Sequence, residues 1–128
     1  MARRFLEGTL HEETRPVLTD RDILAMRQEA GSVSIHEKLL AYAVKIAEET
    51  RNKAEIACGA SPRALLSMLR CAQALAYLSD RDYCIPEDIV EAASLTIPHR
   101  LVLAPGARTN RIAKEDLVNK ILTQVSVP

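Results

Sequence analysis

The sequence predicts an all-α protein: a bundle of five helices, with room for one short two-stranded β element. Two features of the composition favour this fold. Aromatic residues make up only 3% of the chain and hydrophobic residues 48%, so the core must be built mainly from aliphatic side chains and alanine, which suit helix packing. The chain also contains only four glycines, whereas an all-β fold needs many turn residues. Apolar residues recur at helical spacing in several separate stretches, which define the predicted helices.

Length and charge limit the class of protein. A chain of 128 residues is long enough to bury one core. Its 17 basic and 17 acidic residues cancel, so the chain lacks the overall positive field that attracts nucleic acid. No run of 18 or more apolar residues exists, so we expect no membrane span. Residues 1–4 are not followed by the apolar segment of a secretory signal, and we expect the protein in the cytoplasm.

The three cysteines, Cys58, Cys71 and Cys84, are spaced 13 residues apart. None belongs to a CxxC pair, and the three histidines lie at no metal-ligand spacing from them. We therefore expect reduced, mostly buried thiols and no metal site.

The N-terminal part is predicted to be a tail followed by a helix. Residues 1–16 show no hydrophobic period and are interpreted as a tail or linker, whereas residues 17–128 form the folded domain. Thr19 and Asp22 have the spacing of a capping box, in which each side chain bonds a backbone N–H at a helix start. Gly31 is predicted to end this first helix.

The second helix is predicted to begin with another capping box, formed by Ser34 and Glu37. Its apolar stripe has helical spacing, and Arg51 is interpreted as a cation in its last turn, where the helix dipole is negative. Residues 52–59 are predicted to be a connection.

The third helix is the clearest. Ser61 is a favourable N-cap, Pro62 suits the first helical position, and the helical pattern continues to about Leu78. Its apolar face is wide, which predicts a central helix that packs on several sides.

The C-terminal half is predicted to alternate short extended pieces with helices. Residues 83–85 are β-prone and precede a proline, so they should be extended, and we expect them to pair with a second extended piece, residues 101–103. A fourth helix begins at Pro86. Residues 105–113 are expected to form a loop before a last helix over residues 114–124.

No segment of the chain carries the residues of a complete catalytic site. A nucleotide hydrolase needs a phosphate loop that ends in Gly-Lys-Ser/Thr, yet none of the four glycines is followed by lysine. No apolar strand ends in paired acids that could hold magnesium, and the scattered histidines give no signature of nucleophilic catalysis. The chain alone is therefore expected to be non-catalytic.

Arg63 occupies an unfavourable position in the predicted third helix. It lies in the first turn, where the helix dipole is positive, and a cation there costs about 0.3–1 kcal/mol. A bound anion would remove this cost, because the guanidinium and the free N–H groups would share one negative charge, and phosphate is the natural candidate. The alternative is a surface arginine that is solvated or paired with a carboxylate.

The segment Gly-Ala-Ser-Pro-Arg-Ala at residues 59–64 leads into the third helix. Further characteristic segments follow at residues 65–70, 76–83, 86–89 and 98–103, and in the final helix with the end of the chain at 124–128. On these segments and in this order, residues 17–128 resemble the C-terminal lid of MoxR-family AAA+ ATPases, and the segment 59–64 is the most specific of them. The resemblance implies the five-helix AAA+ lid fold.

The resemblance also implies roles for single residues. Arg63 matches the sensor-2 arginine, which in the family reaches from the lid to the γ-phosphate of ATP and is the only catalytic residue expected here. Ala60, Ser61 and Pro62 would border the nucleotide together with Arg63. Arg51 matches a recurrent arginine of the lid to which we assign no role.

For the parent protein, the resemblance implies an ATP hydrolase with chaperone-like activity that uses ATP and Mg. The partners would be its own N-terminal AAA+ core, neighbouring subunits of a ring (a homo-hexamer) and a client protein complex. Because the core is missing, we expect the chain to be a separated lid, or else a natural truncation, and to hold no cofactor by itself. His99 and Arg100 also match, and we expect them to support packing between the fourth helix and residues 101–103.

Two alternatives stay open at this stage. The first is a free-standing helical adaptor that binds a protein partner. The second is a nucleic-acid-binding module that uses exposed arginines, although balanced charge and the lack of interleaved aromatic residues disfavour it. The arginines concerned would be Arg63, Arg70, Arg100, Arg108 and Arg111.

Overall fold

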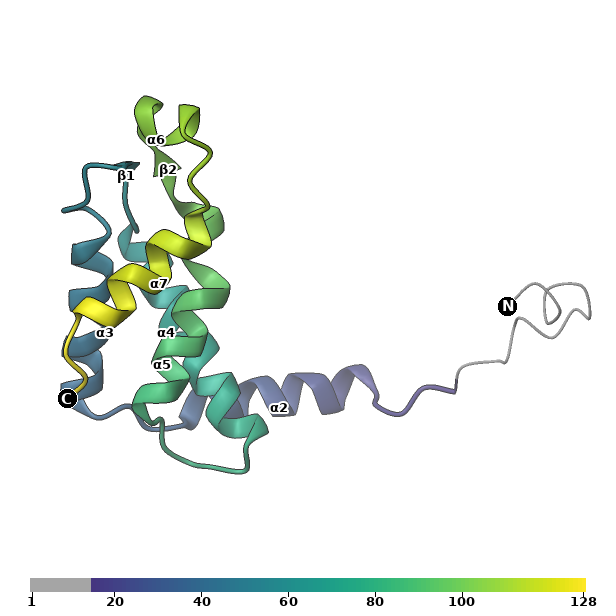
Figure 1. Cartoon of the computed structure of the whole chain (residues 1–128). Helices are drawn as coiled ribbons and strands as arrows, with labels where there is room; N and C mark the ends of the chain where they lie inside the picture. Colours follow the sequence, from purple (N-terminus) through teal and green to yellow (C-terminus); the bar gives the residue numbers. More distant parts are fainter. Residues whose placement is uncertain (1–14) are drawn as a thin grey trace, which may run out of the picture.

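The structure, a computed structural model, describes residues 15–128. This part of the chain holds six α-helices, one 3-10 turn and one two-stranded sheet (Figure 1). In chain order the elements are α2 (Asp20–Ser32), α3 (Glu37–Glu49), β1 (Ile56–Cys58), α4 (Pro62–Leu78), α5 (Pro86–Thr96), η1 (Pro98–Arg100), β2 (Val102–Leu103), α6 (Pro105–Thr109) and α7 (Lys114–Gln124). The predicted all-α class with one short β element is confirmed.

Helix α4 is the centre of the bundle, as predicted. Ala64, Met68, Ala72 and Ala76 recur every four residues along it and are all fully buried. Three of these four are alanines, so neighbouring helices approach α4 closely along this ridge. Helices α3 and α5 pack on α4, and α7 packs on α3 and α5. Each of these three helices contributes a fully buried isoleucine, namely Ile46, Ile89 and Ile121. The core is therefore aliphatic, as the composition indicates.

The two-stranded sheet joins β1 to β2 in antiparallel pairing, with Ile56 opposite Leu103 and Cys58 opposite Val102. The prediction that residues 83–85 pair with 101–103 is therefore wrong. Helix α5 explains the difference, because the two segments lie before and after its 11 residues, and a helix of that length separates them by about 16 Å.

Residue Tyr83 pairs instead with Ser34 through a parallel bridge. The backbone N–H of Ser34 donates to Asp82 O at 2.9 Å, and Ser34 O accepts from Cys84 N–H at 2.9 Å. Ser34 thus tethers the segment before α5 and does not cap α3, so the predicted Ser34 capping box is wrong. The N-cap of α3 is His36, whose Nδ1 accepts from the N–H of Lys38 at 3.2 Å.

Helix α2 projects from the bundle (Figure 1), and none of its residues is buried. The predicted capping box of Thr19 and Asp22 is present. The helix continues through Gly31 to Ser32, so the prediction that Gly31 ends it is wrong. Gly31 serves a close approach instead, because a Cβ there would lie 2.8 Å from Nη1 of Arg70.

The remaining differences are local. Helix α7 has the predicted bounds, but the predicted loop 105–113 contains the short helix α6, which begins at Pro105. Of the predicted tail, residues 1–14 lie outside the described residues, and residues 15–16 are exposed without regular structure. The sheet and α6 lie at one end of the bundle and α2 at the other (Figure 1).

Candidate functional site

The segment that carries the Gly-Ala-Ser-Pro-Arg motif joins β1 to the start of α4. Ser61 caps the helix as predicted, since its hydroxyl accepts from the N–H of Ala64 at 3.2 Å. Pro62 occupies the first helical position, where it leaves no N–H unpaired. Arg63 follows in the first turn of α4, which contains no acidic residue.

The backbone of Ala60 is fixed to the end of α3 through both of its polar groups. Its N–H donates to Oγ1 of Thr50 at 2.8 Å, and its carbonyl accepts from Nε and Nη2 of Arg51 at 3.1 and 2.8 Å. The hydroxyl of Thr50 in turn donates to Ala47 O at 2.6 Å. Thr50 and Ala60 are both fully buried. We call Thr50, Arg51 and Ala60, with their bonds, the Ala60 clamp.

Gly59 lets this clamp form. A Cβ at Gly59 would lie 2.7 Å from Oγ1 of Thr50, 2.8 Å from Cγ of Arg51 and 2.9 Å from its backbone N. Real Cβ atoms do not approach backbone and branched side-chain atoms so closely, so any larger residue would push the motif away from α3.

Arg51 therefore has a different position from the one predicted. It does not sit in the last turn of a helix, because α3 ends at Glu49 and Arg51 turns back to the carbonyl of Ala60. The resemblance to the family assigned no role to Arg51. In the structure Arg51 helps to hold Ala60, which lies three residues before Arg63.

The side chain of Arg63 is exposed. Within residues 15–128 its guanidinium makes no hydrogen bond or ion pair, and its backbone N–H has no partner either. Ser61 and Pro62 are exposed beside it, whereas Ala60 is buried. Next to the motif lies an open groove of about 430 Å³, lined by Arg51 and residues 56–62. The four predicted site residues are thus contiguous, and three of them reach the surface.

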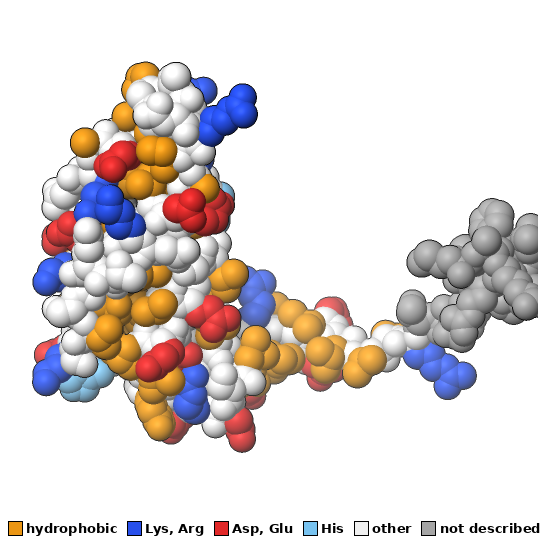
Figure 2. All heavy atoms as spheres, in the orientation of Figure 1, with side chains coloured by type: hydrophobic (Ala, Val, Ile, Leu, Met, Phe, Trp, Pro, Cys, Tyr) orange, Lys and Arg blue, Asp and Glu red, His pale blue; other side chains and the backbone are white. Residues whose placement is uncertain are grey.

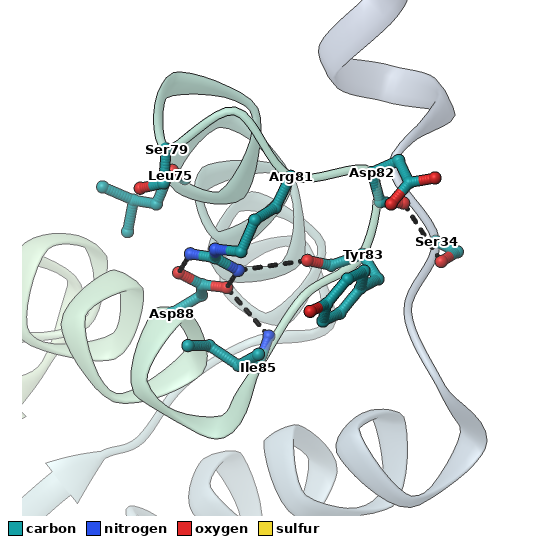
Figure 3. A network of polar contacts seen from close by, with 8 residues as sticks. All are labelled: Ser34, Leu75, Ser79, Arg81, Asp82, Tyr83, Ile85 and Asp88. Carbon is teal, nitrogen blue, oxygen red and sulfur yellow. Dashed lines mark hydrogen bonds and ion pairs between the residues drawn. The ribbon is translucent and has the colours of Figure 1, made fainter.

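A second polar network, which was not predicted, fixes the turn between α4 and α5 (Figure 3). Arg81 donates two hydrogen bonds to Asp88, Nη1 to Oδ2 and Nη2 to Oδ1, both at 2.7 Å. Asp88 Oδ2 also accepts from the N–H of Ile85 at 2.8 Å, and Arg81 donates to Tyr83 O at 3.1 Å. The side chain of Asp88 is only 7% exposed.

The protonation of Asp88 reflects these contacts. Burial alone raises the pKa of Asp88, but the hydrogen bonds from Arg81 and from the Ile85 N–H, with the charge of Arg81, outweigh it, so its pKa lies below the ordinary value. The carboxylate is therefore charged in the folded protein at neutral pH. Asp88 lies in the first turn of the helix that begins at Pro86. Its partner Arg81 lies seven residues upstream, before that helix, and no local sequence pattern indicates the pair.

The cysteines differ in part from the expectation. All three are free thiols, but Cys58 is exposed on β1, Cys71 is half-buried and only Cys84 is buried. Burial raises the pKa of Cys84 to about 11, the charge of Asp88 adds to this, and Arg81 counteracts it. Burial, together with the charge of Glu91, raises the pKa of Cys71. Cys84 is therefore an unreactive thiol at neutral pH.

The expectation for His99 and Arg100 is also wrong. Both side chains are exposed, and Nε of Arg100 donates to Nε2 of His99 at 3.3 Å. The buried residues of the connection between α5 and β2 are Ile97, Pro98 and Leu101.

Over residues 15–128, no three His, Cys, Asp or Glu side chains come together as metal ligands would. In the same range, no helix has the length and hydrophobicity that crossing a bilayer requires.

Known proteins and structures resemble the chain along most of its length. A family model described as the AAA lid domain matches residues 48–121. YeaC of Bacillus subtilis (strain 168) is 36% identical over 117 residues, which are 91% of this chain and 37% of YeaC. The chaperone MoxR1 of Mycobacterium tuberculosis is 32% identical over 130 residues, which are 94% of this chain and 34% of MoxR1. A crystal structure of a putative ATPase from Cytophaga hutchinsonii superposes with a TM-score of 0.89 at 29% identity, over 98% of this chain and 41% of that one.

The chain thus spans little more than a third of the length of the curated relatives it matches. The family model extends from the end of α3 into α7. It therefore includes the Ala60 clamp, Arg63 and the pair of Arg81 and Asp88. The fold, the family match and the relatives agree: the chain belongs to the AAA lid domain family and is a lid of the MoxR type.

Proposed function

We propose that the chain is the nucleotide-sensing C-terminal lid of a cytoplasmic MoxR-type AAA+ ATPase with chaperone-like activity. In this role Arg63 is the sensor-2 arginine: it reaches the γ-phosphate of ATP held by the parent's core and contributes to ATP binding and hydrolysis. The observation that carries the proposal is the exposed Arg63 at the start of α4, without a partner among residues 15–128.

Electrostatics support this role. The positive end of α4 and the guanidinium of Arg63 lie together, and the first turn of α4 offers no carboxylate to compensate them. Pro62 has no N–H, and the N–H of Ala64 donates to the hydroxyl of Ser61. Among residues 62–64, at the start of α4, the backbone N–H of Arg63 is therefore the donor available to a ligand. The oxygens of a bound phosphate would accept hydrogen bonds from the backbone N–H and from the guanidinium of Arg63.

The residues present fit ATP but leave its metal to another domain. Ser61, Pro62 and Arg63 are exposed and can border a triphosphate, whereas Ala60 is buried and fixes their position. Residues 15–128 bring no group of acids together that would hold Mg. Mg and the phosphate loop would therefore come from the parent's core, and ATP would supply the γ-phosphate that Arg63 detects.

The Ala60 clamp gives the lid a way to transmit this contact. Because Ala60 is bonded to the end of α3 through both backbone groups, the backbone that leads to Arg63 is held to the bundle. Contact with a γ-phosphate would then tilt the lid as a rigid body. In a homo-hexameric ring this motion would reach the neighbouring subunit and, through it, a client protein complex.

The test is ATP turnover by the full-length protein. We expect Arg63→Ala to lower turnover by at least about tenfold and to leave the circular dichroism spectrum unchanged. The matched control is Arg108→Ala, which removes an exposed arginine from α6. Near-wild-type turnover of Arg63→Ala would remove Arg63 from the mechanism. ATP hydrolysis by the purified 128-residue chain would contradict the proposal that the parent's core carries the catalytic site.

A further inference from the structure

Two arginines from different helices face a cleft between α2 and α4, apart from the Arg63 site. Arg27 of α2 and Arg70 of α4 line a pocket of about 490 Å³. The other lining residues are uncharged, namely Ala30, Gly31, Gln73 and Ala74. Neither arginine forms an ion pair within residues 15–128. The cleft is therefore lined by two positively charged side chains and by no acidic residue.

The floor of the cleft is fixed by contacts between the two helices. Nε2 of Gln73 donates to Gly31 O at 3.2 Å and to Val33 O at 2.8 Å. Nη1 of Arg70 lies 2.8 Å from the place that a Cβ of Gly31 would take, so the guanidinium rests against the last turn of α2. On α2, Arg27 precedes Gly31 by four residues and shares its face.

This arrangement favours a carboxylate as the ligand. Like charges that face one cleft repel each other, and an anion between them replaces repulsion with charge-assisted hydrogen bonds. The planar guanidinium matches a carboxylate through two parallel N–H donors.

Exposed leucines beside the arginines indicate what accompanies the carboxylate. Leu24 precedes Arg27 by one turn of α2 and is 59% exposed, and Leu66 precedes Arg70 by one turn of α4 and is 64% exposed. Figure 2 shows hydrophobic side chains along the projecting helix α2. A free phosphate would leave these leucines in water, whereas a protein segment with aliphatic side chains would cover them.

We propose that the cleft between Arg27 and Arg70 is a docking site for an acidic protein segment that carries aliphatic side chains next to its carboxylate. The carboxylate lies between the two guanidinium groups, and the aliphatic side chains cover Leu24 and Leu66. The proposal does not depend on Arg63 or on nucleotide.

The experiment is a titration of the 128-residue chain, labelled with ¹⁵N, followed by amide chemical shifts. The probe is a capped five-residue peptide of alternating glutamate and leucine. We expect shifts centred on residues 27–31 and 70–74, and binding weaker by about threefold to tenfold in Arg27→Gln and in Arg70→Gln. Arg108→Gln, on the distant helix α6, should bind as wild type does. Arg63→Gln should also bind normally, which separates this site from the nucleotide role.

Three outcomes would overturn the proposal. Shifts that avoid residues 27–31 and 70–74 would place the peptide elsewhere. Equal binding of a peptide in which glutamine replaces glutamate would show apolar adhesion without a carboxylate site. Inorganic phosphate that produces the same shifts at the same concentration would show a simple anion site.

Discussion

The hydroxyl of Thr50 joins two parts of the chain that are ten residues apart: it accepts from the N–H of Ala60 at 2.8 Å and donates to Ala47 O at 2.6 Å. Through this hydroxyl the last turn of α3 fixes the segment that precedes Arg63. Arg51 completes the connection at the carbonyl of Ala60. The direction in which Arg63 leaves the bundle is therefore set by α3 as well as by its own helix.

Thr50→Val tests this connection. Valine keeps the shape of threonine but leaves the buried N–H of Ala60 without a partner, so we expect the free energy of unfolding to fall by about 1–3 kcal/mol. Urea denaturation of the chain measures this change. Thr50→Ser keeps the hydroxyl and loses only the methyl group, so it should cost clearly less. A Thr50→Val variant as stable as wild type, with a loss only in Thr50→Ser, would show that the methyl group, not the hydrogen bond, matters.

Gly59→Ala should also destabilise the chain, by about 1–3 kcal/mol. The added Cβ would meet Thr50 and Arg51 at less than 3 Å, and these atoms belong to the clamp. Gly106→Ala is the matched control, since a Cβ there meets nothing within 4 Å, and alanine favours the short helix α6. The comparison of melting temperatures checks both. A neutral Gly59→Ala would contradict the close approach of the motif to α3.

The pair of Arg81 and Asp88 predicts a loss of stability in acid. The pKa of Asp88 is lowered in the folded chain, so its contribution is fully present above the unfolded pKa, about 3.9, and is lost as pH falls through the lower folded pKa. Asp88→Asn should cost about 1–3 kcal/mol at pH 7. This difference from wild type should shrink below about pH 4.

Urea denaturation of both proteins across pH 2–7 measures this effect. Asp82→Asn is the matched control, because the Asp82 side chain is exposed and only its carbonyl is bonded to the rest of the chain. A constant difference between Asp88→Asn and wild type at every pH would argue against a charged Asp88 in the folded state.

Asp80 offers a stabilising substitution. It has a φ of 57°, in the left-handed region, and follows Ser79, the C-cap of α4. There the N–H of Arg81 donates to Ala76 O and that of Asp80 to Tyr77 O, both at 3.0 Å, which is the pattern that commonly ends a helix on glycine. We expect Asp80→Gly to raise the free energy of unfolding by about 0.5–1 kcal/mol and Asp80→Ala to lower it. If both variants melted at the same temperature, backbone strain at Asp80 would have no part in stability.

The features that the sequence predicted well are those set by three or four neighbouring residues. The capping box of Thr19 and Asp22, the Ser61 cap and the bounds of α7 all depend on such local signals. The features it missed depend on contacts between distant segments. Ser34 has the spacing of a cap, yet its backbone pairs with Tyr83, and nothing within four residues of Ser34 indicates that partner.

The candidate site divides in the same way. Arg63 could be singled out from its position in a first helical turn, because the helix dipole is a local property. The role of Arg51 at Ala60 could not be derived from spacing, since it requires that the chain between them turn back on itself through β1. The cleft between Arg27 and Arg70 likewise exists only because α2 and α4 meet in space.

The claim that Arg63 detects the γ-phosphate is tested most directly by nucleotide preference. In the full-length protein, the dissociation constants of ADP and of a non-hydrolysable ATP analogue should be measured for wild type and for Arg63→Ala. We predict that wild type prefers the triphosphate and that Arg63→Ala loses about tenfold of this preference while its affinity for ADP changes little. An unchanged preference in Arg63→Ala would contradict the account.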